Sequence, residues 1–263
     1  MLKNLQTNKI LWTITTSLTL IVATIGVILP HIYDGLFAKE FIPGALPQDI
    51  LTIFVCFIMF YLIAKTKEDS VKIQIFIISI IGSFFYLYGI YTIERVYNFF
   101  YIFYAGIFAM SFWSILYGLM NLKEEIFSKI KLSTTIIRTT AITGLIIASL
   151  FTLLWISALI PIMREHNQID HLYSIYILDL CFIMPAFFIT SIMSFKKKVI
   201  GIIFTPAIFI VGFFVIFPLG LGEMIKPFYG QITDYKTMAI SFIFSILMIS
   251  IAFLGLNKIK ISK

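Results

Sequence analysis

The sequence has few charged residues for its length. Only 13% of its 263 residues are charged, whereas 60% are hydrophobic and the mean hydropathy is +1.01. A soluble domain carries about 25% charged residues, so this chain has too few to cover the surface of such a fold. The composition therefore excludes an ordinary soluble domain and predicts an integral membrane protein.

Cysteine is also scarce, and both copies, Cys56 and Cys181, lie inside apolar segments. Two cysteines cannot by themselves form a disulfide framework or a metal-binding knuckle. We therefore expect two buried, unreactive thiols, with a redox pair as the alternative.

Several catalytic and cofactor signatures are missing from the sequence. No lysine lies in the middle of an apolar run, where a retinal protein needs one, and Glu124-Glu125 is not followed by the arginine of a CAAX-type intramembrane protease. There is no Gly-x-Ser-x-Gly, His-Glu-x-x-His or phosphate-binding glycine loop. We predict no cofactor.

Long apolar runs are what the sequence does contain. Eight runs of about 18–24 residues can each cross about 30 Å of hydrocarbon as a helix, whereas β-barrel strands would be shorter and alternate in polarity. The first run exceeds the hydrophobic region of a signal peptide and lacks a cleavage site, so we expect it to be retained. We predict an all-α membrane protein with eight transmembrane helices, at residues 10–30, 47–64, 73–92, 98–120, 139–162, 172–195, 199–218 and 237–257.

The basic residues are distributed unequally between the two sides of these runs. Fifteen of the twenty Lys and Arg residues fall on the side that holds both ends of the chain. The positive-inside rule then predicts cytoplasmic N- and C-termini, and the net charge of +7 needs no nucleic-acid partner to explain it. Most acids and tyrosines and all three histidines gather toward the opposite side. We therefore expect an outward-facing polar region.

The chain is expected to form one polytopic membrane domain, 1–263, that consists of two similar halves. Val27-Ile-Leu-Pro30 resembles Ala158-Leu-Ile-Pro161, and an aspartate follows each proline, at Asp49 and Asp179. We therefore hypothesise two parallel four-helix repeats, 1–122 and 139–257. In such a repeat the two aspartates would occupy equivalent positions near a pseudo-twofold axis, where transporters often bind their substrates.

Asp179 is the most informative residue of the apolar runs. It lies about 10 Å along the sixth run from its outer end, where an ionised carboxylate is costly, so we expect it to face protein or water rather than lipid. Pro185 leaves the carbonyl of Cys181 without its helical partner and predicts a kink just below Asp179. Two interpretations stay open, a ligand- or proton-binding role and a structural hydrogen bond from a tyrosine. The tyrosines at a suitable depth are Tyr176, Tyr86, Tyr88 and Tyr91.

Further polar residues belong to the same outer region. The candidate ligand- or proton-binding residues are Asp179, Asp49, Tyr176, His31, Asp34, Glu94 and Asn98. Capping at the start of the second run is an alternative explanation of Asp49. An interfacial aromatic belt can explain Tyr97, Tyr101 and Tyr104, which share a helical face.

The histidines do not form a metal-binding pattern. His166 and His171 are five residues apart in a short loop, whereas a helical metal site spaces its histidines four apart. We predict no metal site.

The segment Asp179-Leu-Cys-Phe-Ile-Met-Pro185, with the following Lys196-Lys-Lys-Val-Ile-Gly201, resembles a family of uncharacterised bacterial eight-helix membrane proteins. That family shows a similar Asp-Leu-x-x-x-x-Pro stretch, then a short basic loop and a glycine. Gln48-Asp49 and the tyrosine-rich segment 86–98 are similar too. The resemblance implies a bacterial plasma membrane and supplies no reaction.

These observations lead to one main functional hypothesis and two alternatives. The main one is an outward-facing pocket, centred on Asp179 with Asp49 and Tyr176 nearby, that binds or moves a small solute, ion or proton. An enzyme acting on a lipid or lipid-linked substrate at the outer leaflet, using His31, His166 or His171 as acid or base, is the first alternative. A structural accessory subunit is the second. The lipid bilayer is the one partner that all three share.

Overall fold

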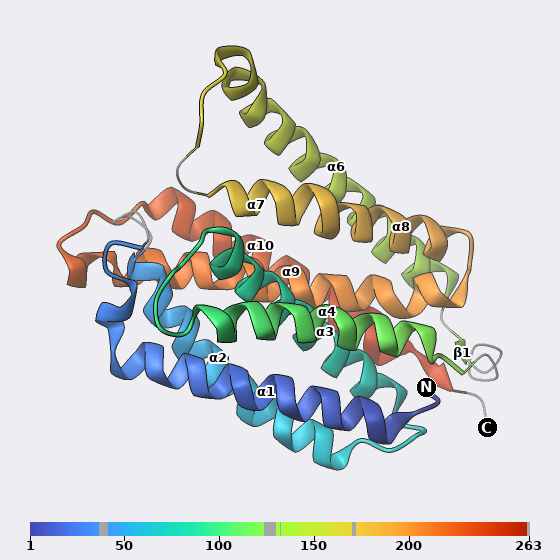
Figure 1. Ribbon diagram of the computed structural model, residues 1–263. Helices are drawn as coiled ribbons and strands as arrows, with labels where there is room; N and C mark the ends of the chain where they lie inside the picture. The colour runs from blue at the N-terminus through green and yellow to red at the C-terminus, as the bar shows by residue number, and fades with distance from the viewer. Residues whose placement is uncertain (37–41, 124–129, 132, 170–171, 262–263) are drawn as a thin grey trace. The chain divides into compact units, whose positions relative to one another are not determined.

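The computed structural model describes residues 1–36, 42–123, 130–131, 133–169 and 172–261. The chain is 84% helical, and eight of the described helices are long and apolar enough to cross a membrane (Figure 1). The prediction of an all-α protein with eight membrane-spanning helices is therefore confirmed. Which side of the membrane holds the termini stays a prediction.

The long elements follow the predicted runs closely. Seven of them are single helices: α1 (Leu5–Ile28), α2 (Ile42–Lys65), α3 (Val71–Ile93), α4 (Tyr101–Met120), α6 (Thr134–Glu165), α9 (Val199–Ile225) and α10 (Tyr235–Lys258). The remaining span, the sixth, is built from three shorter pieces in succession, α7 (Tyr173–Leu178), η2 (Asp179–Ile183) and α8 (Met184–Phe195). Short 3-10 turns, η1 (Pro30–Tyr33) and η3 (Lys226–Tyr229), follow α1 and α9. Two strands of two residues each, β1 (Ile130–Lys131) and β2 (Lys260–Ile261), pair antiparallel.

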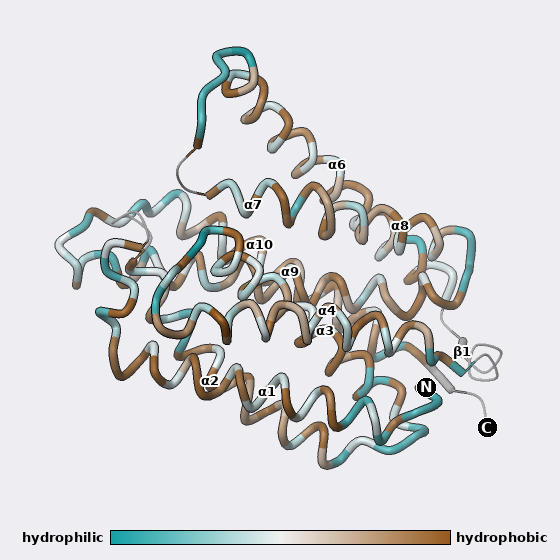
Figure 2. Tube along the Cα trace, in the orientation of Figure 1, coloured by the Kyte–Doolittle hydropathy of each residue, from teal (hydrophilic) through white to brown (hydrophobic). Residues whose placement is uncertain are grey.

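Apolar residues dominate the helices, and hydrophilic residues concentrate at the helix ends and in the connections (Figure 2). In a bilayer each backbone N–H and C=O must be satisfied inside its own segment, which a helix achieves. Large apolar side chains on the outside of these helices, such as Leu153 and Ile146 of α6, are more than half exposed. Exposed apolar faces of this kind are the surfaces that lipid covers.

Helix α2 begins five residues before the predicted start at residue 47. The apolar run was counted only from residue 47, where the polar Gln48-Asp49 pair marks its outer boundary. Pro43 is the second residue of α2, where the backbone N–H has no intrahelical partner and proline is tolerated, whereas Pro47 lies inside the helix. Asp49 therefore lies in the third turn, and the interpretation that it caps the helix is wrong.

The chain divides into two compact units. Unit 1 comprises Met1–Lys123 and Ile210–Ile249, and unit 2 comprises Glu124–Phe209 and Ser250–Lys263. In unit 1, α1 packs against α2 and α4, and α3 packs against α4. In unit 2, α6 packs against α8. The units are defined by packing and do not test internal similarity, so the single domain and its repeats, 1–122 and 139–257, stay predictions.

Candidate functional site

The carboxyl group of Asp49 is fully buried in unit 1. Its side chain is 0% exposed, and its Oδ2 atom accepts a hydrogen bond of 2.8 Å from the Tyr33 hydroxyl. The other carboxylate oxygen, Oδ1, is buried and has no hydrogen-bond partner among the described residues. A buried polar atom without a partner is unusual, because leaving it unpaired costs about 1–3 kcal/mol. Asp49 is therefore the centre of the candidate site.

Four tyrosines surround this carboxyl group. Tyr91 makes ring contacts with Tyr33, Tyr88 and Tyr104, with centroid separations of 5.9, 5.7 and 5.1 Å. Burial, the nearby Tyr91 and the nearby Asp49 raise the pKa of Tyr33. Its hydroxyl therefore keeps its proton and remains a donor to Asp49.

Local sequence explains how Tyr33 reaches Asp49. Helix α1 ends at Ile28, and Pro30 begins the 3-10 turn η1, whose last residue is the buried Tyr33. Gly26, in the last turns of α1, faces the pair so closely that a Cβ atom there would overlap the Asp49 carboxylate. Glycine at this position lets the α1 backbone approach the buried acid.

Asn98 connects this cluster to η1 and to the start of α4. Its Nδ2 donates to the Tyr104 hydroxyl at 3.0 Å and to the Ile32 carbonyl at 3.3 Å. Its Oδ1 accepts from the backbone N–H of Phe100 just before α4. Two of the predicted site residues, Asp49 and Asn98, are thus joined through Tyr33, Tyr91 and Tyr104.

Asp179 lies in unit 2, where it also is buried, at 5% exposed. Its Oδ2 accepts a hydrogen bond of 2.6 Å from the indole Nε1 of Trp155 in α6. The Trp155 ring stacks edge-on against Tyr176, with centroids 5.3 Å apart. The predicted pair of Asp179 and Tyr176 is therefore brought together around a tryptophan that the sequence analysis did not consider. The α3 candidates Tyr88 and Tyr91 lie in unit 1 beside Asp49.

The irregularity expected above Pro185 takes the form of a π-helical turn. Residues Asp179–Ile183 form η2, and the backbone N–H of Met184 bonds to the Asp179 carbonyl, five residues back. Single π turns are common beside functional residues and beside positions that interrupt the regular bonding ladder. Pro185, which has no N–H, follows at once in the first turn of α8.

The remaining predicted site residues lie at the edge of these clusters. His31 and Asp34 form a pair of 3.1 Å on the surface, with side chains 90% and 59% exposed. Glu94 is half-buried at the end of α3, where its backbone N–H bonds to Ile90. His166 is exposed at the end of α6, and His171 lies outside the described residues. The enzyme hypothesis, which rests on these histidines, stays a hypothesis.

Two predictions about individual side chains were wrong. Cys181 is exposed, whereas Cys56 is buried as expected, and both thiols are free. Tyr97 precedes α4 and is 64% exposed, as an interfacial residue can be, but Tyr104 is 0% exposed and belongs to the tyrosine cluster. The residues that the structure describes contain no group of three or more His, Cys, Asp or Glu side chains able to hold a metal ion.

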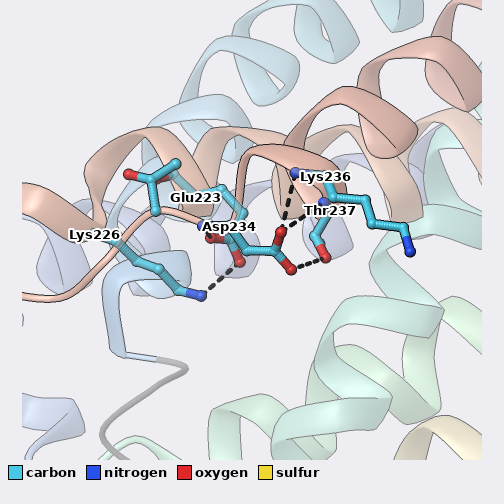
Figure 3. A network of polar contacts seen from close by, with 6 residues as sticks. Glu223, Lys226, Asp234, Lys236 and Thr237 are labelled. Atoms are coloured by element: carbon cyan, nitrogen blue, oxygen red, sulfur yellow. Dashed lines mark hydrogen bonds and ion pairs between the residues drawn. The ribbon is translucent and has the colours of Figure 1, made fainter.

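A second polar network joins α9, η3 and α10 (Figure 3). Glu223 Oε1 pairs with Lys226 Nζ at 2.6 Å, and Glu223 Oε2 accepts the backbone N–H of Asp234 at 2.9 Å. Asp234 in turn caps α10, because its Oδ1 accepts the N–H groups of Lys236 and Thr237. These bonds fasten the connection between the two helices, so we interpret the network as structural.

The Asp234 cap gives a pH-dependent prediction. Hydrogen bonds from the Thr237 hydroxyl and the Thr237 backbone N–H hold the pKa of Asp234 below its usual value. Its contribution to stability is full above an unfolded pKa of about 3.9 and is lost as the pH falls through the lower folded value. We expect Asp234→Ala to lower the unfolding temperature at pH 6, with a difference from wild type that shrinks below about pH 4. Asp69→Ala, at another exposed acid, is the control, and an equal effect of both variants would contradict the cap.

The fold and the buried site together define the class of protein. Eight apolar helices, most with exposed apolar faces, make this a multi-pass membrane protein that contacts the lipid bilayer. In the described residues, three acids are buried in spanning segments: Asp49, Asp179 and Glu223, the last of which pairs with Lys226. No protein-family model, curated protein or solved structure matches the chain.

Proposed function

We propose that this protein binds or moves a small solute, ion or proton across a bacterial plasma membrane, and that Asp49 is the central group of its binding site. The observation that carries the proposal is the Oδ1 atom of a fully buried carboxyl group in a membrane-spanning helix, which has no hydrogen-bond partner in the part of the chain that the structure describes. Ionisable residues within spanning helices usually mark ion or proton pathways, because their burial is costly unless it serves a function.

Asp49 is favoured over Asp179 as the central group because of their contacts. The Trp155 indole donates to Asp179 at 2.6 Å, a short bond that a structural role explains. At Asp49, in contrast, one oxygen remains available within a cluster of hydroxyl groups. The bacterial membrane and the outward-facing orientation of the site come from the resemblance and from the distribution of basic residues.

The test measures how ligands change the stability of the purified protein in detergent micelles. The unfolding temperature is recorded from pH 5 to 9, and at constant pH in sodium, potassium and tetramethylammonium chloride. A ligand that binds only the folded state raises the unfolding temperature. We expect wild type to respond to at least one of these conditions and Asp49→Asn, which keeps the shape of the side chain, to lose that response.

The matched control is Asp34→Asn, which alters an exposed acid of the same unit. It should respond as wild type does. If Asp49→Asn responds to every salt and every pH as wild type does, Asp49 is not the binding group and the proposal fails.

A further inference from the structure

The packing around Asp49 restricts what the site can take. The Tyr33 hydroxyl lies 2.8 Å from one carboxylate oxygen, and the α1 backbone at Gly26 closes the same side. The rings of Tyr88, Tyr91 and Tyr104 pack against one another at centroid distances of 5.1 to 6.0 Å. A solute or a hydrated ion would have to displace these contacts, whereas a proton needs only the free lone pair of Oδ1.

Among the described residues, the titratable groups that interact with Asp49 are phenols. Tyr33 comes from η1, Tyr88 and Tyr91 from α3, and Tyr104 from α4, and each interacts with the carboxyl group. Helix α1 contributes Gly26. On the α9 side, Gly222 packs against Gly44 of α2, and the charged residues there, Glu223 and Lys226, pair with each other. Phenols donate and accept hydrogen bonds without carrying charge at neutral pH, so they suit the handling of a proton.

Buried polar side chains lie along one face of α1 between Asn8 and Thr19. Asn8, Thr15, Thr16 and Thr19 are each 0% exposed and share one face, which ends at Gly26. Among the described residues, Asn8 Oδ1 and the hydroxyls of Thr16 and Thr19 have no hydrogen-bond partner. From Asn8 to Thr19 the helix rises about 17 Å, which is about half the thickness of the hydrocarbon core.

Helix α4 adds hydroxyl groups at matching levels. The two helices run antiparallel, because Asn8 lies beside Gly118 at one end and Ile32 bonds to Asn98 at the other. Counting from the Asn8–Gly118 level places Thr15 opposite Ser111, and Trp12 opposite Ser114. Ser111 and Ser114 are 0% and 1% exposed, and their hydroxyls are also without partners in the described chain.

We propose that the ligand of Asp49 is a proton, and that it travels along this row of hydroxyl groups between α1 and α4. The inference rests on the proposed function and specifies its ligand. Serine and threonine hydroxyls both donate and accept, so they pass a proton directly or through intervening water. The row begins near Asn4, whose amide bonds to Tyr117 and Asn121 at an exposed end. It ends at Thr19, whose carbonyl accepts a hydrogen bond of 3.5 Å from the Tyr88 hydroxyl of the tyrosine cluster around Asp49. From Asp49, Tyr33, Tyr91 and Tyr104 lead to the half-buried Asn98.

The test measures proton flux into proteoliposomes that contain a pH-sensitive dye, driven by a potassium diffusion potential set with valinomycin. Wild type should admit protons faster than protein-free liposomes. The double variant Thr16→Val with Ser111→Ala removes one hydroxyl from each helix, both without partners among the residues described and within one residue of the same level. It should lower the flux about tenfold, the effect of a barrier raised by roughly one hydrogen bond. Asp49→Asn should abolish it. Thr13→Val, at an exposed threonine of the same helix, should leave it unchanged.

Each result has a defined meaning, provided that size-exclusion chromatography shows all variants folded. A wild-type flux equal to that of protein-free liposomes overturns the inference, and so does a double variant that conducts as Thr13→Val does. If either occurs while Asp49→Asn still loses the sodium or potassium response of the unfolding temperature, the proposed function survives with another ligand. If Asp49→Asn changes neither flux nor that response, both proposals fail.

Discussion

Gly26→Ala is expected to lower the free energy of unfolding by about 2 kcal/mol, within the 1–3 kcal/mol typical of overpacking a buried contact. The added Cβ would overlap the Asp49 carboxylate and would lie 2.6 Å from the Tyr33 hydroxyl. One of these side chains must move, and the 2.8 Å bond between them is then lost. Titration with sodium dodecyl sulfate in mixed micelles, followed by circular dichroism, measures the change.

Gly106→Ala is the matched control for this variant. Gly106 lies in the interior of α4, and a Cβ there would meet no atom within 4 Å. Glycine in a helix interior is about 0.5–1 kcal/mol less favourable than alanine, so this substitution should be neutral or stabilising. Loss of stability in Gly106→Ala as large as in Gly26→Ala would show that the close approach of α1 to Asp49 has no special role.

Trp155→Phe is expected to lower the free energy of unfolding by about 2 kcal/mol, because a hydrogen bond to a charged group contributes about 1.5–3 kcal/mol. The phenylalanine ring retains an aromatic contact with Tyr176 but removes the indole N–H that donates to the buried Asp179. The same detergent titration measures the loss.

Two variants make this second prediction specific. Trp113→Phe changes a tryptophan that is 61% exposed, and it should have little effect. Asp179→Asn keeps an oxygen that accepts from Trp155, so it should cost less stability than Trp155→Phe. The structural interpretation of Asp179 would be contradicted if Trp155→Phe were as mild as Trp113→Phe.

The number and approximate limits of the helices could be predicted from the sequence, because hydropathy over about 20 residues decides which segments can span a bilayer. The start of α2 could not, because the polar Gln48-Asp49 pair marks an apparent end of the apolar run, whereas the helix begins at Ile42. That error hid the depth of Asp49, which is an interior residue of α2.

The hydrogen-bond partners of the two carboxyl groups could not be predicted from the sequence either, for a different reason. Trp155 precedes Asp179 by 24 residues, and Tyr33 precedes Asp49 by 16. Which residues of neighbouring helices meet depends on their packing and register, and no local pattern encodes either. Sequence reasoning therefore found both acids and missed Trp155, Tyr33 and Gly26. The sequence offered one signal for Tyr33, which is that this tyrosine lies between the candidate residues His31 and Asp34, just after the first span.

The most direct test of Asp49 as a proton-binding group is an infrared pH titration of wild type and Asp49→Asn in lipid. A protonated carboxyl group gives its own carbonyl stretching band, separate from that of an ionised carboxylate. We predict a band in wild type that disappears as the pH is raised and that is missing from Asp49→Asn at every pH. Identical carboxyl bands in the two proteins throughout the titration would contradict the account.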